Sequence, residues 1–120
     1  MEAPFPEIQY PMAAKEAANS QAEAASIDAV SQLIERGRAE GNPVAAILIE
    51  PIQFNENRMA SPIFYKNLQS LAKENGVAFI TDETRTGMGA TGRMWGHQHW
   101  HLTYVLYPYL LSFAVRALTM

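Results

Sequence analysis

The sequence has 120 residues, of which 48% are hydrophobic and 18% charged, which fits one small globular domain and excludes a disordered or fibrous chain. Its formal net charge is -3 and its nine lysines and arginines are scattered, which argues against a nucleic-acid partner. The absence of cysteine excludes disulfides, thiolate metal sites and cysteine nucleophiles. The first residues fit neither a secretory signal nor a transit peptide, so we expect an intracellular protein, in the cytoplasm or in mitochondria.

The first 19 residues are predicted to form an irregular N-terminal segment, because they contain three prolines, each of which removes an amide donor and disfavours helix in the preceding residue. These are Pro4, Pro6 and Pro11. A helix is expected from Ser20, because Ser20-Gln21-Ala22-Glu23 has the pattern of a capping box. Gly41 and Pro43 are expected to end it. Apolar residues recur along one side of this helix, at Ile27, Val30, Leu33 and Ile34.

Two strand patterns flank a second predicted helix. Residues 44–50, VAAILIE, form a nearly unbroken apolar run ending in Glu50, typical of a parallel strand covered on both faces. The second helix is expected to have Ser61 as N-cap, Pro62 in its first turn and Asn75-Gly76 as its end. Residues 76–83, GVAFITDE, repeat the strand pattern. The order helix, strand, helix, strand predicts an α/β fold with Glu50 and Asp82 at carboxyl ends of strands, where such sheets bind ligands.

Residues 101–120 differ in character from the rest of the chain, because they contain no Asp, Glu or Lys and are aromatic and aliphatic. The uncharged stretch 102–115 is interrupted by Pro108. It is also shorter than the roughly 18 to 20 residues that cross a bilayer. We therefore predict no membrane span and no membrane partner.

The hexapeptide of residues 87–92 matches the G-x-G-x-x-G pattern of dinucleotide-binding loops. Such a loop needs its first glycine directly after the strand and a helix after its last glycine. Here several residues separate Asp82 from Gly87, and no acidic residue follows Glu83 to bind a ribose. Sharp turns with positive φ angles explain the glycines better. A dinucleotide-binding module through Gly87–Gly92 remains the weaker alternative.

Three histidines alternate in the sequence, His97, His99 and His101, so on an extended strand they would share one face and could bind zinc or copper. We favour packing and hydrogen bonding for the first two. For Trp95 and Trp100 we favour positions in a core or an interface.

Asp82 allows two interpretations. A carboxylate at a buried strand end can simply accept hydrogen bonds from backbone amides of the following loop, or it can pair with a cation such as a protonated pyridine nitrogen. The surrounding motif favours the second. Glu50-Pro51-Ile52-Gln53, followed about 30 residues later by Asp82-Glu83-x-x-Thr86-Gly87-x-Gly89-x-Thr91-Gly92, resembles the class III pyridoxal-phosphate aminotransferases, and among them the 4-aminobutyrate aminotransferases.

The resemblance implies that residues 1–100 are part of the large domain of a fold type I transferase and that residues 101–120 are a divergent apolar tail. It also implies transfer of an amino group from 4-aminobutyrate to 2-oxoglutarate, with pyridoxal 5'-phosphate as cofactor and a homodimer as the assembly.

Four site residues follow from the resemblance. Asp82 matches the aspartate that pairs with the pyridine nitrogen, and Glu50 matches a glutamate on the substrate side of the cofactor. Thr84 stands where the family has a valine that packs against the ring. Arg85 replaces a glutamine that hydrogen-bonds the phenolic oxygen, and it adds a fixed positive charge there.

The lysine that binds the cofactor covalently in the family lies about 30 residues beyond this aspartate, whereas the last lysine here is Lys73. The family's phosphate-binding loop is missing as well. We therefore expect no transamination by this chain alone. An interrupted sequence and a non-catalytic fragment that associates with full-length members both remain open.

Overall fold

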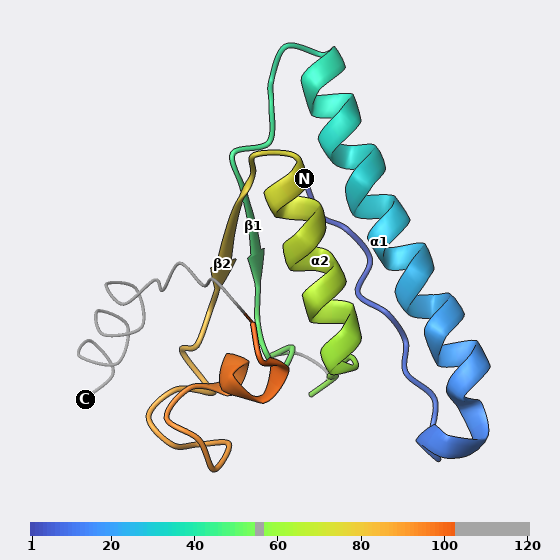
Figure 1. Cartoon of the computed structure of the whole chain (residues 1–120), viewed down its shortest axis with the longest axis vertical. Coiled ribbons are helices and arrows are strands. Elements are labelled where there is room, and N and C mark those ends of the chain that lie inside the picture. Colours follow the sequence, from blue (N-terminus) through green and yellow to red (C-terminus); the bar gives the residue numbers. More distant parts are fainter. Residues whose placement is uncertain (55–56, 103–120) are drawn as a thin grey trace.

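The computed structural model describes residues 1–54 and 57–102. Figure 1 shows two helices beside a small sheet, with loops gathered at one end of the strands. The predicted order helix, strand, helix, strand is confirmed, with short 3-10 helices, η1 and η2, added before the first helix and after the second strand. The elements are η1 Met12–Lys15, α1 Glu16–Ala39, β1 Ala46–Ile49, α2 Pro62–Glu74, β2 Ala78–Thr81 and η2 Gly96–Trp100.

The first long helix begins earlier than the sequence predicted. η1 follows Pro11 directly and continues into α1, so Ser20 lies inside the helix and caps nothing. The irregular segment therefore ends at Pro11 instead of residue 19. The reason is a contact distant in sequence: the Asn19 side chain accepts from the Gln9 N–H at 2.8 Å and donates to the Gln9 carbonyl at 3.0 Å. This pair holds the first turns of α1 against the preceding chain.

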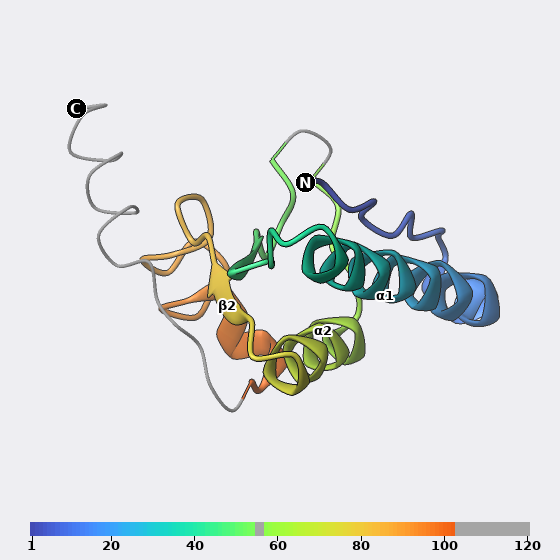
Figure 2. The same cartoon turned by 90° about the horizontal axis from the view of Figure 1, so that it is seen from above.

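The N-terminal segment runs alongside α1 instead of extending away from it, as Figures 1 and 2 show. The Ser26 hydroxyl donates to the Pro4 carbonyl at 2.6 Å, which attaches the start of the chain to the middle of the helix. Because Pro4 has no amide hydrogen, its carbonyl is its one backbone group that can hydrogen-bond, and here it is satisfied.

Both helices end where the sequence predicted, in Schellman motifs with a glycine in the left-handed conformation. The φ angles are +72° at Gly41 and +68° at Gly76. The closing hydrogen bonds run from the Asn42 N–H to the Gly37 carbonyl at 2.8 Å and from the Val77 N–H to the Ala72 carbonyl at 2.9 Å.

The start of α2 is also confirmed, with Ser61 as N-cap and Pro62 next to it. The Ser61 hydroxyl oxygen accepts from the Phe64 N–H at 3.2 Å and donates to Oε2 of Glu23 at 2.8 Å. The Ser61 N–H donates to Oε1 of Glu23 at 2.7 Å. Glu23, which the sequence assigned to a capping box in its own helix, therefore caps the neighbouring helix instead.

Replacing Ser61 with alanine is expected to lower the free energy of unfolding by about 1 kcal/mol, because the Phe64 N–H and the Glu23 carboxylate each lose a partner. Urea unfolding of the purified chain measures the change. Ser70→Ala is the control, because Ser70 is exposed in the same helix and makes no capping bond. Equal losses in the two variants would contradict the capping role.

The two strands pair in parallel, with Ile49 opposite Thr81, and the pairing continues through a 2.8 Å hydrogen bond from the Asp82 N–H to the Ile49 carbonyl. Both helices lie on the same side of this sheet (Figures 1 and 2). The core forms between them, from Ile34, Ile49, Phe64, Tyr65, Leu68, Ala72, Val77, Phe79 and Trp100.

The prediction that the first strand is covered on both faces is wrong for the described residues. Ile49 is buried, but Leu48 on the opposite face is 63% exposed. The reason is that covering both faces of a parallel sheet requires helices on both sides, and the two described α-helices share one side.

None of the described helices is long and apolar enough to cross a bilayer. The expectations about the apolar tail concern mainly residues 103–120, which lie outside the described part of the chain.

Candidate functional site

Two loops leave the carboxyl ends of the strands and form what we call the rim: residues 50–54 and 57–58 after β1 and residues 82–87 after β2. Glu50 and Asp82 directly follow the paired ends of the two strands, as the sequence predicted. Parallel pairing brings them to neighbouring positions because the carboxyl ends of parallel strands share one edge. No described hydrogen bond joins the two side chains, and each carboxylate instead binds its own loop.

Asp82 is half-buried and held by Thr84. Its Oδ1 accepts from the Thr84 N–H at 2.9 Å and from the Thr84 hydroxyl at 2.5 Å. The Thr84 hydroxyl thus helps to orient the carboxylate. Both bonds use Oδ1, and within the described chain Oδ2 accepts no hydrogen bond, so this oxygen can receive a donor from a bound group. Asp82 therefore accepts a hydrogen bond from the backbone of its own loop, as the first interpretation expects, and its second oxygen leaves the ligand-binding interpretation open.

Glu50 is turned toward the loop that it begins. Its Oε2 accepts from the Phe54 N–H at 2.7 Å, which closes the first turn after β1. The loop is closed further by a hydrogen bond of 2.9 Å from the Gln53 N–H to the Arg58 carbonyl. The carboxylate of Glu50 therefore has a fixed direction set by the backbone of its own loop.

Arg85 reaches from one rim loop to the other. Its Nη1 donates to the Phe54 carbonyl at 3.0 Å and its Nη2 donates to Oδ1 of Asn57 at 3.3 Å. The guanidinium carbon also lies 4.7 Å from the centre of the Phe54 ring, within cation–π range. The side chain predicted to face the cofactor therefore contacts the loop that carries Glu50.

Glu83 is a buried carboxylate that the sequence interpretation left without a role. It is 3% exposed, and four donors converge on it. Oε1 accepts from the His97 N–H and lies 2.8 Å from His97 Nδ1, while Oε2 accepts from the Gly96 N–H at 2.9 Å and from the Thr86 hydroxyl. We call this group the Glu83 clamp. It attaches the loop after β2 to η2.

The charge state of Glu83 reflects this environment. Burial by itself raises the pKa of the carboxyl, but the hydrogen bonds from His97, Thr86 and Gly96 together outweigh it and hold the pKa below its ordinary value of 4.5. The clamp is therefore ionised at neutral pH. The sequence signal for it was only a second acid, two residues after the end of β2, and its donors come from residues 86–97.

The histidines do not form the strand face on which the metal-site alternative depended. η2 is a 3-10 helix, in which His97 is buried against Glu83 and His99 is exposed. His99 Nε2 lies 3.1 Å from the carbonyl and from the hydroxyl of Thr91. Across residues 1–54 and 57–102, no three His, Asp or Glu side chains are placed to hold a metal ion. Packing and hydrogen bonding, as favoured from the sequence, describe the first two histidines.

The glycine-rich segment is a packed turn. Gly89 and Gly92 have φ angles of +88° and +84°, as predicted for sharp turns. At Gly87 the constraint is space: a Cβ atom would lie 2.8 Å from the Trp95 ring and 2.9 Å from the Glu83 carbonyl oxygen. No α-helix follows Gly92 among the described residues, so the helix end that a dinucleotide pyrophosphate needs is missing.

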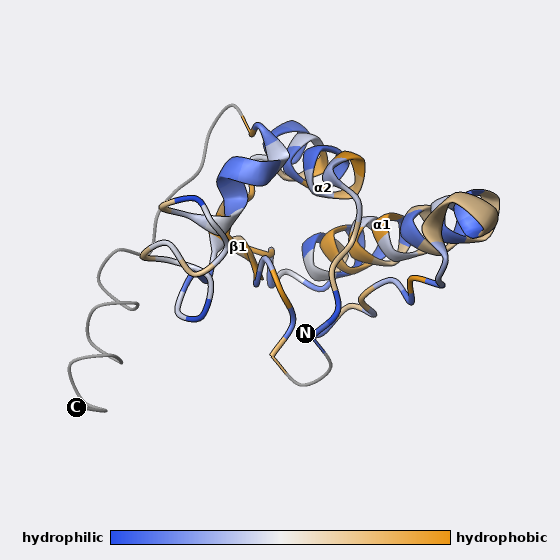
Figure 3. Ribbon diagram, turned by 90° about the horizontal axis from the view of Figure 1, so that it is seen from below, coloured by the Kyte–Doolittle hydropathy of each residue, from blue (hydrophilic) through white to orange (hydrophobic). Residues whose placement is uncertain are grey.

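Tyr65 and Trp100 connect the rim to the core. Their rings stack with centres 3.6 Å apart and planes at 10°. The Tyr65 hydroxyl donates to the Pro51 carbonyl at 3.0 Å and accepts from the Ala60 N–H at 3.2 Å. Burial raises the pKa of Tyr65 to about 12, so this hydroxyl stays protonated and able to donate. In Figure 3 η2 is coloured as hydrophilic, yet its Trp100 belongs to the core.

Comparison with known proteins identifies the family. A model of the class-III aminotransferases matches residues 1–119. The chain belongs to the class-III aminotransferase family. Among curated relatives, the 4-aminobutyrate aminotransferase of Emericella nidulans is 40% identical over 119 residues, which are 98% of this chain and 23% of that protein.

Solved structures of aminotransferases share this fold. An omega-transaminase from Thermomicrobium roseum matches with a TM-score of 0.63 over 74% of this chain and 20% of that one, at 23% identity. The ornithine aminotransferase of Toxoplasma gondii, whose structure has partial occupancy of PLP at the active site, matches with a TM-score of 0.57 at 26% identity, over 68% of this chain and 18% of its own. The fold is therefore that of a piece of the fold type I domain.

This aminotransferase chain spans about a fifth of the length of the curated relatives that it matches. Class-III aminotransferases depend on pyridoxal phosphate, so the cofactor is supported at the level of the family. The family match extends past residue 100, and the proposed boundary between residues 100 and 101 stays a prediction.

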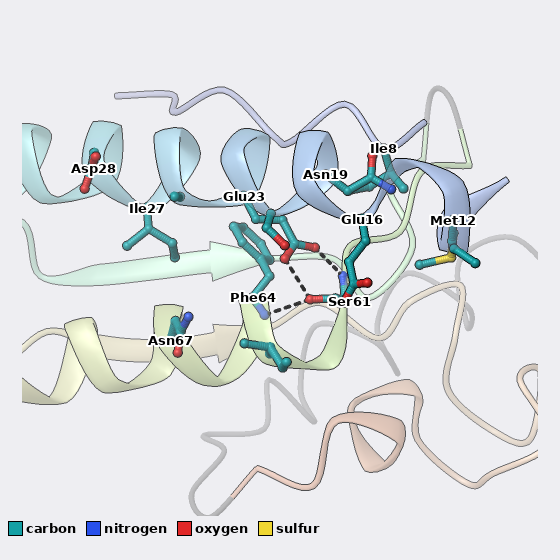
Figure 4. Close-up of a pocket in the computed structure, with 14 residues that line it drawn as sticks. Ile8, Met12, Glu16, Asn19, Glu23, Ile27, Asp28, Ser61, Phe64 and Asn67 are labelled. Atoms are coloured by element: carbon teal, nitrogen blue, oxygen red, sulfur yellow. Dashed lines mark hydrogen bonds between the residues drawn. The ribbon is translucent and has the colours of Figure 1, made fainter. Parts of the chain in front are cut away.

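A hollow of about 540 Å³ lies away from the rim of this aminotransferase chain, between the N-terminal segment, α1 and the first turn of α2. Figure 4 shows Glu23 and Ser61 hydrogen-bonded at its wall, with Ile27 and Phe64 nearby. Neither Glu50 nor Asp82 lines it. The hollow is thus separate from the residues assigned to the cofactor.

Proposed function

We propose that this chain is part of the cofactor-binding domain of a pyridoxal-phosphate-dependent transaminase that transfers the amino group of 4-aminobutyrate to 2-oxoglutarate, and that the complete protein is a homodimer. Family membership and the names of the relatives support this proposal. The observation that carries it is Asp82, a carboxylate at the end of a strand, oriented by Thr84 through one oxygen while the other is available.

Four residues have proposed roles toward the cofactor. When bound, pyridoxal phosphate supplies an electron sink for carbanion chemistry. Oδ2 of Asp82 would accept a hydrogen bond from the protonated pyridine nitrogen and so favour the protonated form of the ring. Thr84 orients Asp82 and presents its β-branched side chain to the ring. Arg85 is the candidate donor to the phenolic oxygen, through N–H groups that its loop contacts leave free, and Glu50 lies on the substrate side.

This chain alone is expected to lack transaminase activity, because no lysine follows Asp82 to bind the cofactor covalently. The exposed face of the sheet suits the packing of further protein, from the same polypeptide or from a longer member of the family. Borohydride reduction of the chain with cofactor, followed by peptide mapping, tests the expected inactivity by showing whether any lysine binds the cofactor covalently. Labelling of Lys66 or Lys73 coupled to turnover would contradict it.

The Asp82 assignment predicts that Asp82→Asn weakens binding of pyridoxal 5'-phosphate by the chain roughly tenfold or more, because a charge-assisted hydrogen bond is lost. Titration followed by the amide NMR signals of residues 82–86 measures the affinity without any turnover. Glu74→Asn is the control, since it removes the same charge from an exposed position at the end of α2. Unchanged affinity in Asp82→Asn would remove the basis for the assignment.

A further inference from the structure

The guanidinium of Arg85 makes three different contacts with one loop. It donates from two nitrogens to the Phe54 carbonyl and the Asn57 side chain, and it lies over the Phe54 ring. A planar group with divergent N–H donors can satisfy two acceptors and stack at the same time, which neither an ammonium nor an amide can do. The contacts are therefore specific to arginine at this position.

The same loop residue also holds Glu50. The N–H of Phe54 donates to Oε2 of Glu50 at 2.7 Å, while the carbonyl of Phe54 accepts from Arg85. Fixing Phe54 from one side thus fixes the donor that orients the Glu50 carboxylate on the other. The residues form a continuous connection from the loop after β2 to the acid after β1.

We propose that Arg85 is a positioning residue for Glu50: it locks the loop after β1 through Phe54 and thereby sets the direction of the carboxylate on the substrate side. This role is additional to the proposed role of Arg85 as a donor to the phenolic oxygen of the cofactor. It rests on the proposed function only for the role of Glu50, and the contacts themselves involve no cofactor.

The test uses the 120-residue chain without cofactor and follows the amide of Phe54 by NMR. An N–H bound to a carboxylate changes its chemical shift as that carboxylate titrates, and it exchanges slowly with solvent. In the unsubstituted chain the Phe54 signal is expected to follow the ionisation of Glu50, and Glu50→Gln is expected to abolish that dependence.

Arg85→Gln is expected to reduce the amplitude of this pH-dependent shift and to speed exchange of the Phe54 amide roughly tenfold, because two hydrogen bonds and a ring contact are lost. Arg85→Lys is expected to resemble Arg85→Gln, since lysine keeps the charge but not the planar geometry. Arg93→Gln is the matched control: it makes the same change at an exposed arginine in the glycine-rich segment.

Three outcomes overturn the proposal. The first is a Phe54 signal that behaves in Arg85→Gln as it does in Arg93→Gln. The second is full rescue by Arg85→Lys, which would show that charge alone matters. The third is general loss of structure in Arg85→Gln, which would make Arg85 a determinant of the whole fold. Failure of cofactor binding leaves these readouts unaffected, so the two proposals fail separately.

Discussion

Glu83→Ala is expected to lower the free energy of unfolding by about 3–5 kcal/mol, because several buried hydrogen bonds to this carboxylate are lost together and each unsatisfied buried donor costs about 1–3 kcal/mol. The substitution removes the carboxylate that contacts the Gly96 N–H, the His97 N–H, His97 Nδ1 and the Thr86 hydroxyl. Since a small domain is stable by only about 5–15 kcal/mol, this loss is a large part of the total.

The effect has a defined dependence on pH. Because the pKa of Glu83 is below 4.5 in the folded chain, the unfolded chain binds more protons in the acidic range. The stability contributed by this ionised carboxylate is fully present above the unfolded pKa of 4.5 and is lost as the pH falls through the lower folded value. The difference in stability between the original chain and Glu83→Ala is therefore expected to shrink with acid.

Urea unfolding at pH 7 and at several values below pH 4.5 measures both parts of this expectation. Glu74→Ala is the control, because it removes an exposed carboxylate at the end of α2. Its effect is expected to stay within the small range typical of surface substitutions. Two results would contradict the stabilising role of Glu83. One is a Glu83→Ala chain as stable as the control at pH 7, and the other is a difference in unfolding free energy between these two chains that grows in acid.

Trp100→Ala is expected to cost a similar amount, about 3–5 kcal/mol, because a large buried ring leaves a cavity that the surroundings fill only in part. The lost ring is the one that stacks on Tyr65. Tyr65 in turn bonds Pro51, the residue after Glu50. Looser packing around Tyr65 is therefore expected to weaken the hydrogen bond to Pro51 and so to loosen the loop that begins at Glu50.

Trp100→Phe is the informative comparison, since it keeps an aromatic ring over Tyr65 and is expected to retain most of the stability. Thermal unfolding gives the ranking, and the Ala60 amide, which donates to the Tyr65 hydroxyl, reports the local effect by hydrogen exchange. Equal stability of Trp100→Ala and Trp100→Phe would mean that the stacked ring contributes little.

The features predicted correctly from the sequence depend on short-range chemistry. Ser61 with Pro62 marks a helix start and Gly76 a helix end, because capping involves residues within one turn. The placement of Glu50 and Asp82 followed from parallel pairing alone, which puts the ends of both strands on one edge.

The errors arose where a distant partner decides the outcome. Ser20 fits a capping box, but Asn19 bonds Gln9 and the helix starts earlier. Glu23 fits the same motif, yet its partner is Ser61, 38 positions away. The role of Glu83 was not predicted, because its donors at Gly96 and His97 come close to it only in the folded chain. Local patterns do not contain such information.

The two-stranded sheet also affects how this chain can associate with other chains. Within the described residues the sheet contains only β1 and β2, so each has one side along which amide and carbonyl groups have no strand beside them. The unpaired amide and carbonyl groups along such a strand edge can hydrogen-bond to an extended segment of the same molecule or of another copy. Copies of this chain in which nothing covers these two edges are therefore expected to associate through them.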